Sequence, residues 1–255
     1  MSLSLASLNL HAGRDADGRP YDVTEAIAAL SANVVLVQEN WRPAGTDSLA
    51  RRAALAGGYE SLAELDVLAG TSLAGLSIAD SSEPGAWGLA VLSRFPMRSC
   101  SAVALGAAPG DVAGVRMAQV VEIEYAEDAL LRVVNVHLTH RLVHGPGQLR
   151  RLIRALEDSD QPTVIGGDFN MCRPTVHLAR GYRPAVRGRT WPARRPVAQI
   201  DHILTGPGVG VARQAVAAPQ GSDHLPIRAS LLLAGHRRAH RLAHIANLHG
   251  FSAAG

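Results

Sequence analysis

The chain has 255 residues, of which 47% are hydrophobic and 18% are charged, and its formal net charge is +3. This composition excludes a wholly disordered chain, because disordered sequences are poor in hydrophobic residues and rich in charge. No apolar run approaches the roughly 18 residues needed to cross a bilayer, and no secretion signal is recognisable. The two cysteines lie far apart and indicate neither a disulfide framework nor a zinc site. We therefore expect a cytoplasmic protein without a transmembrane segment.

The chain opens with a predicted β-α-β unit. Residues 4–8 alternate small and apolar side chains, which predicts a strand that ends at Asn9. A helix is predicted over residues 22–30, because two acidic residues at its start have the spacing of a helix-capping pair. The β-branched run at 34–37 then predicts a buried strand that ends just before Glu39.

The next part of the chain is richer in strands than in helices. A helix is predicted over residues 46–56, where a following pair of glycines provides its stop. Strand-like runs then occur at residues 73–78, 88–92, 101–105 and 115–125. Arg116 lies at the opening of the last of these runs.

Polar side chains also follow the next two predicted strands. The run at 131–136 ends at His137, and an Arg-rich amphipathic helix is predicted over residues 148–156. The apolar run at 163–165 leads into the stretch Gly166-Gly167-Asp168-Phe169-Asn170. The glycines permit a sharp turn or a close approach to a ligand. The alternative for this stretch is an ordinary turn.

Asp168 and Asn170 are two residues apart, so they face the same side of the strand end if the backbone stays extended. Further along, Asp201 lies within an apolar strand at 199–204, and His202 should point to the opposite side and pack. Asp223 and His224 come just before a last predicted strand at 227–233. Oxygen-rich side chains of this kind suit magnesium or manganese rather than zinc.

The order of these residues matches that of a known superfamily. The matching pieces are Asn9, Gln38-Glu39, residues 87–96, His137-Leu138, residues 167–170, residues 200–203 and residues 222–226. Together they resemble the endonuclease/exonuclease/phosphatase superfamily, the deoxyribonuclease-like metal-dependent phosphohydrolases. The resemblance implies one domain over residues 1–234 with a four-layer α/β sandwich, in which two mixed β-sheets pack face to face with helices outside. Residues 235–255 are expected to be a basic His/Arg-rich tail, with a basic amphipathic helix as the alternative.

The resemblance also implies a role for each catalytic residue. Asp168 would orient and deprotonate the attacking water, and Asn170 would hold that water or the phosphate. His224, oriented by Asp201, would stabilise the phosphoryl transition state, and His137 would make a second contact to a phosphate oxygen. These roles match what phosphodiester hydrolysis requires of a protein.

Glu39 is expected to be the main ligand of the cation, with Asn9 and Asp223 completing its site. The expected cofactor is Mg²⁺, with Mn²⁺ as a substitute. Arg116 stands where some family members keep a phosphate-binding arginine. Trp191 could stack on a base or a sugar, although loop tryptophans often cap a core edge instead.

The predicted activity is metal-dependent hydrolysis of phosphoesters, most simply phosphodiesters, by a monomeric enzyme. Nucleic acid, DNA or RNA, is the leading substrate class, because the net charge of +3 and the Arg-rich residues 187–195 suit a polyanion. The segment around His137 resembles the version shared by nonspecific nucleases, deadenylases, sphingomyelinases and inositol phosphatases, which leaves lipid and inositol phosphoesters open. A catalytically inactive anion-binding module is the alternative from another class.

Overall fold

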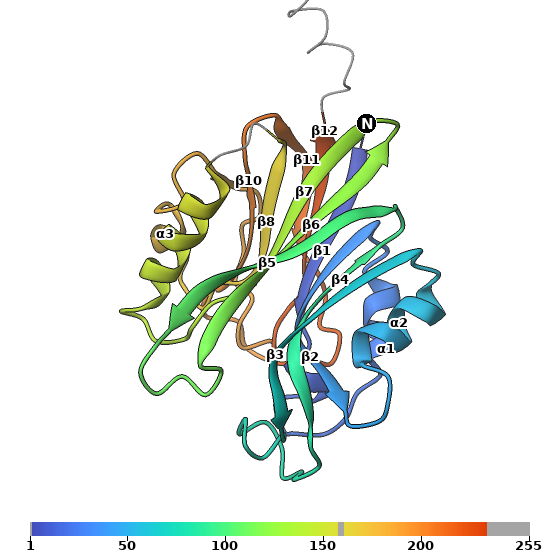
Figure 1. Ribbon diagram of the computed structural model, residues 1–255, viewed down its shortest axis with the longest axis vertical. Helices are drawn as coiled ribbons and strands as arrows, with labels where there is room; N and C mark the ends of the chain where they lie inside the picture. The colour runs from blue at the N-terminus through green and yellow to red at the C-terminus, as the bar shows by residue number, and fades with distance from the viewer. Residues whose placement is uncertain (1, 158–160, 234–255) are drawn as a thin grey trace, which may run out of the picture.

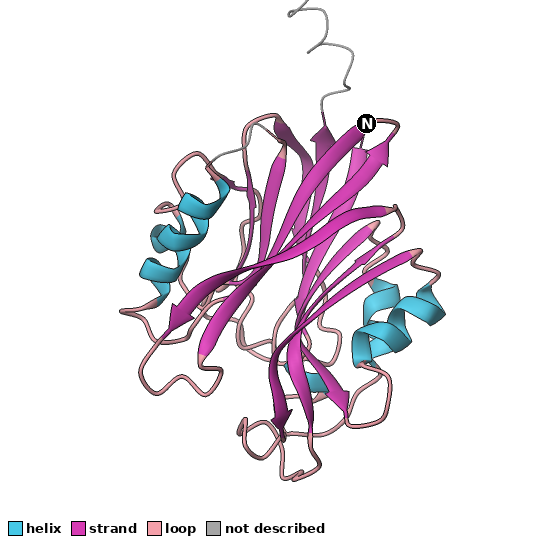
Figure 2. Ribbon diagram, in the orientation of Figure 1, coloured by secondary structure: helices cyan, strands magenta, loops and turns pink. Residues whose placement is uncertain are grey.

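The computed structural model describes residues 2–157 and 161–233 (Figure 1). The predicted tail at 235–255 lies outside the described residues. Within them, the strands form two six-stranded sheets, ordered β11-β12-β1-β2-β4-β3 and β5-β6-β7-β8-β10-β9, and the helices lie to either side of the strands (Figure 2). No helix in these ranges is long and apolar enough to span a bilayer.

The strands of the first sheet are β1 (Ser2–Asn9), β2 (Val34–Pro43), β3 (Ser61–Thr71), β4 (Gly85–Ser93), β11 (Val209–Val216) and β12 (Ile227–Leu233). Those of the second sheet are β5 (Met97–Ala107), β6 (Val115–Ala126), β7 (Ala129–His137), β8 (Thr163–Asp168), β9 (Arg183–Pro184) and β10 (Asp201–Thr205). The helices are α1 (Val23–Ala29), α2 (Leu49–Gly57), α3 (Gly145–Leu156) and α4 (Arg173–Val176), with a 3-10 turn η1 (His11–Gly13).

Each sheet is mixed because it contains one parallel pair of strands among antiparallel neighbours. In the first sheet β1 pairs in parallel with β2, and α1 lies between them in sequence. In the second sheet β7 pairs in parallel with β8, and α3 lies between them. Because parallel strands end at the same edge of a sheet, residues after these four strands are brought to sheet edges in pairs.

Three buried clusters hold the layers together. The cluster between the sheets includes Leu36 of β2 and Val133 of β7. A second cluster packs α3 on the other face of the second sheet, and a third packs α1 and α2 on the outer face of the first. The result is helix, sheet, sheet, helix, so the predicted four-layer α/β sandwich is confirmed.

Helix boundaries agree with the sequence signals that predicted them. The Asp22 carboxylate caps α1 by accepting a hydrogen bond from the Glu25 N–H at 2.9 Å. At the end of α2, Gly58 is the C-cap in the left-handed conformation with φ of 64°, a conformation that glycine adopts without steric cost.

Two edge strands differ from the prediction. The strand expected at 73–78 is a loop, and β3 precedes it at Ser61–Thr71. The apolar residues of the loop misled the prediction, because Leu73 is buried against Trp41 and Trp87 without forming a ladder. The strand β11 was not predicted at all. An edge strand has one neighbour and a largely exposed face, so it lacks a strong apolar pattern.

The glycine pair at the end of β8 allows close packing against neighbouring strands. A Cβ on Gly167 would lie 2.0 Å from the Val136 carbonyl oxygen of β7, and φ there is +141°. A Cβ on Gly166 would lie 2.6 Å from Leu36 of the opposite sheet. The close approach predicted for these glycines is therefore made to neighbouring strands, and it allows Asp168 to reach the site edge.

Candidate active site

The residues predicted to be catalytic converge at one edge of the two sheets. Asn9 ends β1, and Glu39 lies in β2 beside it. In the other sheet His137 and Asp168 are direct register partners at the ends of β7 and β8. Asp201 is the antiparallel partner of Asp168 on β10. Segments from most of the chain therefore contribute side chains to one site.

Asn9 joins the two sheets. Its side-chain N–H groups donate to Glu39 Oε1 at 2.9 Å and to Asp168 Oδ2 at 3.0 Å. Its side-chain oxygen Oδ1 accepts from the His11 backbone N–H at 2.9 Å, which defines the orientation of the amide. Because Asn9 is buried, these bonds hold two carboxylates from different sheets around one small space.

Glu39 is aimed at this space by a β-bulge. The register of β2 against β4 shifts between Gln38 and Asn40, which leaves Glu39 as the extra residue. Its φ is +53°, a left-handed conformation that costs a non-glycine residue energy. Bulges of this kind redirect a side chain at the rim of a sheet, often beside an active site.

Asp168 is buried and accepts a second hydrogen bond, from the Asn170 backbone N–H to its Oδ1 at 2.8 Å. Burial raises the pKa of Asp168 to about 7, against the lowering effect of the charged His224 nearby. Asn170 has φ of +51°, so the extended backbone expected here does not persist. Its side-chain N–H instead donates to the Leu138 carbonyl at 2.9 Å.

His224 and Asp201 form a buried pair. His224 Nδ1 lies 3.1 and 3.0 Å from the two Asp201 oxygens, and its Nε2 lies 3.8 Å from Asp168 Oδ2. Burial disfavours the charged ring, but the carboxylates of Asp201 and Asp168 outweigh it and raise the pKa of His224 to about 10. The ring is therefore a cation at neutral pH, with Nε2–H facing the site.

His137 has the opposite electrostatic character. Its Nε2 lies 3.5 Å from Asp168 Oδ2 and 4.0 Å from Glu39 Oε1. Burial lowers the pKa of His137 well below its usual value, and the positive charges of Arg116 and His224 lower it further. Its Nδ1 is buried without a hydrogen-bond partner in the described part of the chain. The ring is therefore neutral, and it acts as a hydrogen-bonding group.

Arg116 lies beside His137, whose carbonyl oxygen accepts a hydrogen bond from its guanidinium at 3.4 Å. Its guanidinium makes a buried two-point contact with the Asp111 carboxylate at 2.8 and 2.9 Å. It also stacks over the Trp87 ring at 5.4 Å, and that ring contacts His137 at 5.2 Å. These contacts indicate a supporting role of Arg116 beside His137, and its predicted contact with phosphate stays a prediction.

Asp223 and Trp191 lie at the rim of the site. Asp223 Oδ2 accepts a hydrogen bond from Trp191 Nε1 at 3.2 Å, and its Oδ1 lies 3.7 Å from His11 Nδ1. Asp223, which was expected to complete the metal site, therefore contacts His11 and Trp191 at the rim. The Trp191 side chain remains 39% exposed beside it.

Sequence reasoning missed residues that act through backbone contacts. Ser222 Oγ donates to the Asn9 carbonyl at 2.6 Å, and the Tyr21 hydroxyl donates to the Leu10 carbonyl at 2.8 Å. Both fix the end of β1 that carries Asn9. The only available signal was the position of Ser222 two residues before His224. The packing role predicted for His202 is confirmed, since its Nε2 lies 2.9 Å from the Met171 carbonyl.

Two groups of side chains offer ligand atoms for a cation. Asp168, Asp201 and His224 place ligand atoms within 4.8 Å of one another. A charged imidazole lacks a free lone pair for a metal, however, so His224 is a poor ligand while it is paired with Asp201. Glu39 presents a carboxylate oxygen beside the Asn9 amide, and carboxylate and amide oxygens suit a hard divalent cation. The residues at Glu39 therefore fit a metal.

Comparison with known proteins identifies the family of the chain. Residues 6–224 match the model of the Endonuclease/Exonuclease/phosphatase family, and the chain belongs to this family. Proteins of this class are phosphoester hydrolases that generally use a divalent metal. The predicted superfamily is thus confirmed. No curated protein sequence matches the chain.

Several solved structures share the fold. An endonuclease/exonuclease/phosphatase from Beutenbergia cavernae superposes with a TM-score of 0.72 at 21% identity, covering 92% of this chain and 72% of that one. A mannosyl-6-phosphatase from Bacteroides thetaiotaomicron gives 0.65 at 14% identity, with 91% and 100% covered. Sphingomyelinase C from Streptomyces griseocarneus gives 0.60 at 15% identity, with 90% and 99% covered. At these identities the likeness concerns the fold alone.

Proposed function

We propose that the protein is a divalent-metal-dependent hydrolase of phosphodiesters, with nucleic acid as its leading substrate class. The observation that carries the proposal is a buried cationic imidazole next to a carboxyl group whose pKa is close to neutrality. The charged His224 ring lies 3.8 Å from Asp168, whose pKa of about 7 makes it a base near neutrality. Groups with separated pKa values at one site are the arrangement expected of acid and base partners.

Glu39 would be the principal ligand of the cation, with Asn9 supporting it, and Mg²⁺ or Mn²⁺ is the expected metal. When bound, the cation would neutralise charge on the phosphoryl oxygens and make a nearby water easier to deprotonate. The remaining chemistry belongs to the side chains of the protein.

Asp168 would accept the proton of the attacking water, since its burial raises its basicity. His224 would donate a hydrogen bond from Nε2 to a phosphoryl oxygen and offset the charge that develops there. Asp201 keeps the ring charged and oriented through its contacts with Nδ1. The neutral His137 would donate a second hydrogen bond from Nε2, and Asn170 would help to hold the water or the phosphate.

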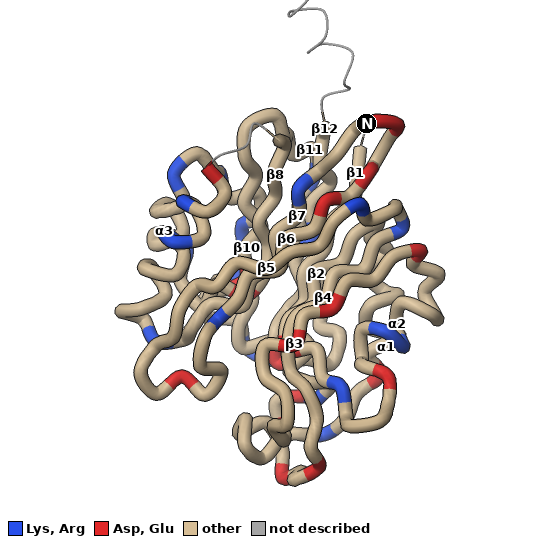
Figure 3. Tube along the Cα trace, viewed as in Figure 1, with Lys and Arg blue, Asp and Glu red and all other residues tan. Residues whose placement is uncertain are grey.

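Nucleic acid leads because cationic and aromatic groups lie beside the site. Arg187, Arg189, Arg194 and Arg195 are exposed in the loop that carries Trp191. The half-exposed Trp191 ring could stack on a base next to the scissile phosphate. In Figure 3 basic and acidic positions alternate along the Cα trace of the rest of the visible chain, so the rim loop supplies the local attraction for a polyanion.

A phospholipid phosphodiester is the second candidate substrate. Leu142 and Val143 are 76% and 88% exposed in the loop that follows β7 and His137. Arg141 beside them anchors this loop to the Gly110 carbonyl. Exposed apolar side chains next to a cation are suited to insertion at a lipid surface.

The test is hydrolysis of bis-p-nitrophenyl phosphate with Mg²⁺ and Mn²⁺ by the wild-type protein and by Asp168→Ala and His224→Ala. Each variant should lose about 10²–10⁴-fold in kcat/KM, the usual contribution of acid–base groups. Asp47→Ala and His177→Ala are matched controls, because both residues are exposed outside the site. A parallel panel of plasmid DNA, RNA, phospholipid vesicles and inositol phosphates identifies the substrate class. Unchanged turnover in either site variant would refute the proposal.

A further inference from the structure

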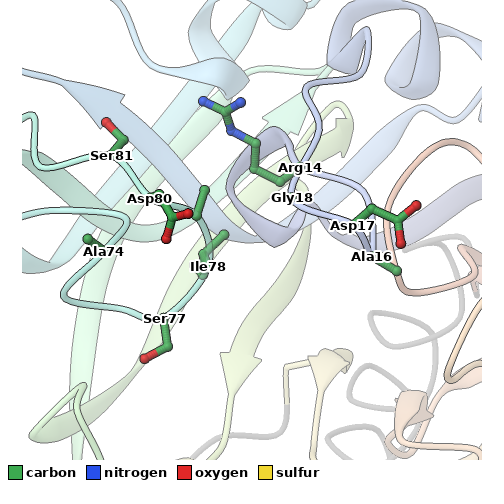
Figure 4. A pocket seen from close by; sticks show the side chains of 10 residues that line it. Arg14, Ala16, Asp17, Gly18, Ala74, Ser77, Ile78, Asp80 and Ser81 are labelled. Carbon is green, nitrogen blue, oxygen red and sulfur yellow. The ribbon is translucent and has the colours of Figure 1, made fainter.

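A cleft of about 900 Å³ lies beside the candidate active site and has no part in the chemistry described above (Figure 4). One wall is the loop at residues 14–18, and the other is the loop at residues 74–81 between β3 and β4. The volume falls within the range of sites that bind small molecules. Its lining consists mainly of charged, hydroxyl and backbone groups, which favours a polar ligand.

The first wall is joined directly to the active site. After Asn9 the chain turns through His11, Ala12 and Gly13, whose φ values of 46°, 50° and 75° are all positive. Arg14 follows this turn. Its carbonyl oxygen lies 3.2 Å from His11 Nδ1, which in turn lies 3.7 Å from Asp223 at the site rim. A substrate held at the catalytic centre can therefore extend into the cleft.

The first wall is also built before any ligand binds. Asp15 Oδ1 accepts hydrogen bonds from the backbone N–H groups of Asp17 at 2.8 Å and Arg19 at 2.9 Å. The Arg194 guanidinium clamps this loop from the rim by donating twice to the Asp17 carboxylate. A wall of this kind loses little conformational entropy when a ligand binds.

Arg14 is the cationic residue of the first wall. Its side chain is partly buried, yet its guanidinium has no hydrogen bond or ion pair within residues 2–157 and 161–233. Asp17 is already paired with Arg19 and Arg194, and its carboxylate points away from the cleft (Figure 4). The Arg14 side chain instead extends between the two loops in the same view. A guanidinium with free donors binds oxyanions through two parallel hydrogen bonds.

The opposite wall supplies groups for neutral hydroxyls. Ser77, Asp80 and Ser81 all line the cleft on this side. The loop is held in shape by the buried Leu73, whose carbonyl accepts from the Ile78 N–H at 2.9 Å. Carboxylate and serine oxygens opposite a cation match a ligand in which hydroxyls lie close to an anionic group.

We propose that this cleft is a second substrate-binding site, which takes a phosphate and the adjoining sugar on the part of the substrate beyond the scissile phosphoester. Arg14 binds the phosphate, and the wall at 74–81 binds the sugar hydroxyls. The inference rests on the proposed function and makes the protein selective for phosphodiesters that carry a second phosphate.

The direct test compares a thymidine dinucleotide with the same dinucleotide phosphorylated at its 5′ or 3′ end. For the wild-type protein, kcat/KM should be about tenfold or more higher for one phosphorylated form, the worth of a charge-assisted contact. In Arg14→Gln this ratio should fall to about one. Arg52→Gln is the matched control, because Arg52 is exposed on α2 at the outer face of the first sheet. An unchanged ratio in Arg14→Gln would overturn the assignment.

A second variant and a binding measurement separate the cleft from the catalytic proposal. Ala74→Phe places a ring in the cleft from an exposed position and should also remove the preference. Calorimetry with thymidine 3′,5′-bisphosphate requires no turnover, and its affinity should fall about tenfold in Arg14→Gln. Arg14-dependent binding without hydrolysis would refute the proposed function and keep the cleft. Hydrolysis with binding that is independent of Arg14 would refute the cleft alone.

Discussion

The two parallel strand pairs reach the same edge but end differently. In the first sheet, β1 and β2 deliver Asn9 and Glu39, and the end of β2 is distorted by a bulge with φ of +53° at Glu39. In the second sheet, β7 and β8 stay in regular register through the His137–Asp168 pair. The first unit, the β1–β2 pair, presents an amide and a carboxylate. The second unit, the β7–β8 pair, presents an imidazole and a carboxylate.

Exposure separates the two units further. The Glu39 side chain is 13% exposed, whereas those of His137 and Asp168 are 7% and 2% exposed. A carboxylate that water can reach is suited to a cation that arrives from solvent. Burial raises the pKa of the Asp168 carboxyl to about 7, although the cationic His224 ring lowers it. A carboxylate with such a pKa is suited to accepting and releasing a proton. Location in the fold therefore assigns different work to two acids of similar intrinsic chemistry.

The largest expected effect tests this division between Glu39 and Asp168. Both Glu39→Gln and Asp168→Asn should lower kcat/KM by about 10²–10⁴-fold. High Mn²⁺ concentration should restore part of the activity of Glu39→Gln, because that variant mainly weakens cation binding. It should restore none in Asp168→Asn, which lacks the base. Equal rescue in metal titrations of both variants would remove the distinction between the two units.

A second prediction tests the support behind the second unit. Arg116→Gln leaves the buried Asp111 carboxylate without its partner, which should cost about 3–5 kcal/mol of stability. Chemical denaturation measures the loss. The double variant Arg116→Gln with Asp111→Asn should recover much of it, because no unpaired charge then remains. Arg98→Gln is a matched control, since its pair with Glu124 lies at the surface. A loss no larger than that of the control would contradict a supporting role for Arg116.

The smallest effect concerns pH and the charged ring of His224. Its pKa is raised from 6.5 to about 10, so folding binds a proton and the stabilisation is fully present below pH 6.5. That contribution is lost as the pH rises toward 10. Glutamine keeps a hydrogen bond to Asp201 but not the charge, so His224→Gln should cost about 1–2 kcal/mol at pH 6.

Denaturation in EDTA across pH 6–10 measures this difference. The stability gap between the wild-type protein and His224→Gln should narrow as the pH rises. A gap that stays constant would show that His224 is not a buried cation. His177→Gln is the control, because this histidine is exposed outside the site.

Much of the site was predictable because its signals are local. The apolar runs that shortly precede Asn9, Glu39, His137 and Asp168 could be recognised from the sequence as strands with polar ends. Asp22 and Gly58 marked helix boundaries in the same way. The edge strand β11 could not be predicted, because a strand with one neighbour carries little apolar pattern. The loop at 72–81 could not be predicted either, because the burial of Leu73 depends on tryptophans that are distant in the sequence.

The order of the motif residues was enough to indicate the family by resemblance, and strand periodicity predicted the opening β-α-β unit and the strands that carry the groups available for chemistry. The fold alone determined how those groups differ. Burial makes Asp168 basic, Asp201 keeps His224 charged, and Asp111 pairs with Arg116 beside His137. The pKa of a side chain and the pairing of a guanidinium depend on solvent exclusion and on charges that packing brings close. Residues that are neighbours in the sequence do not determine either of them.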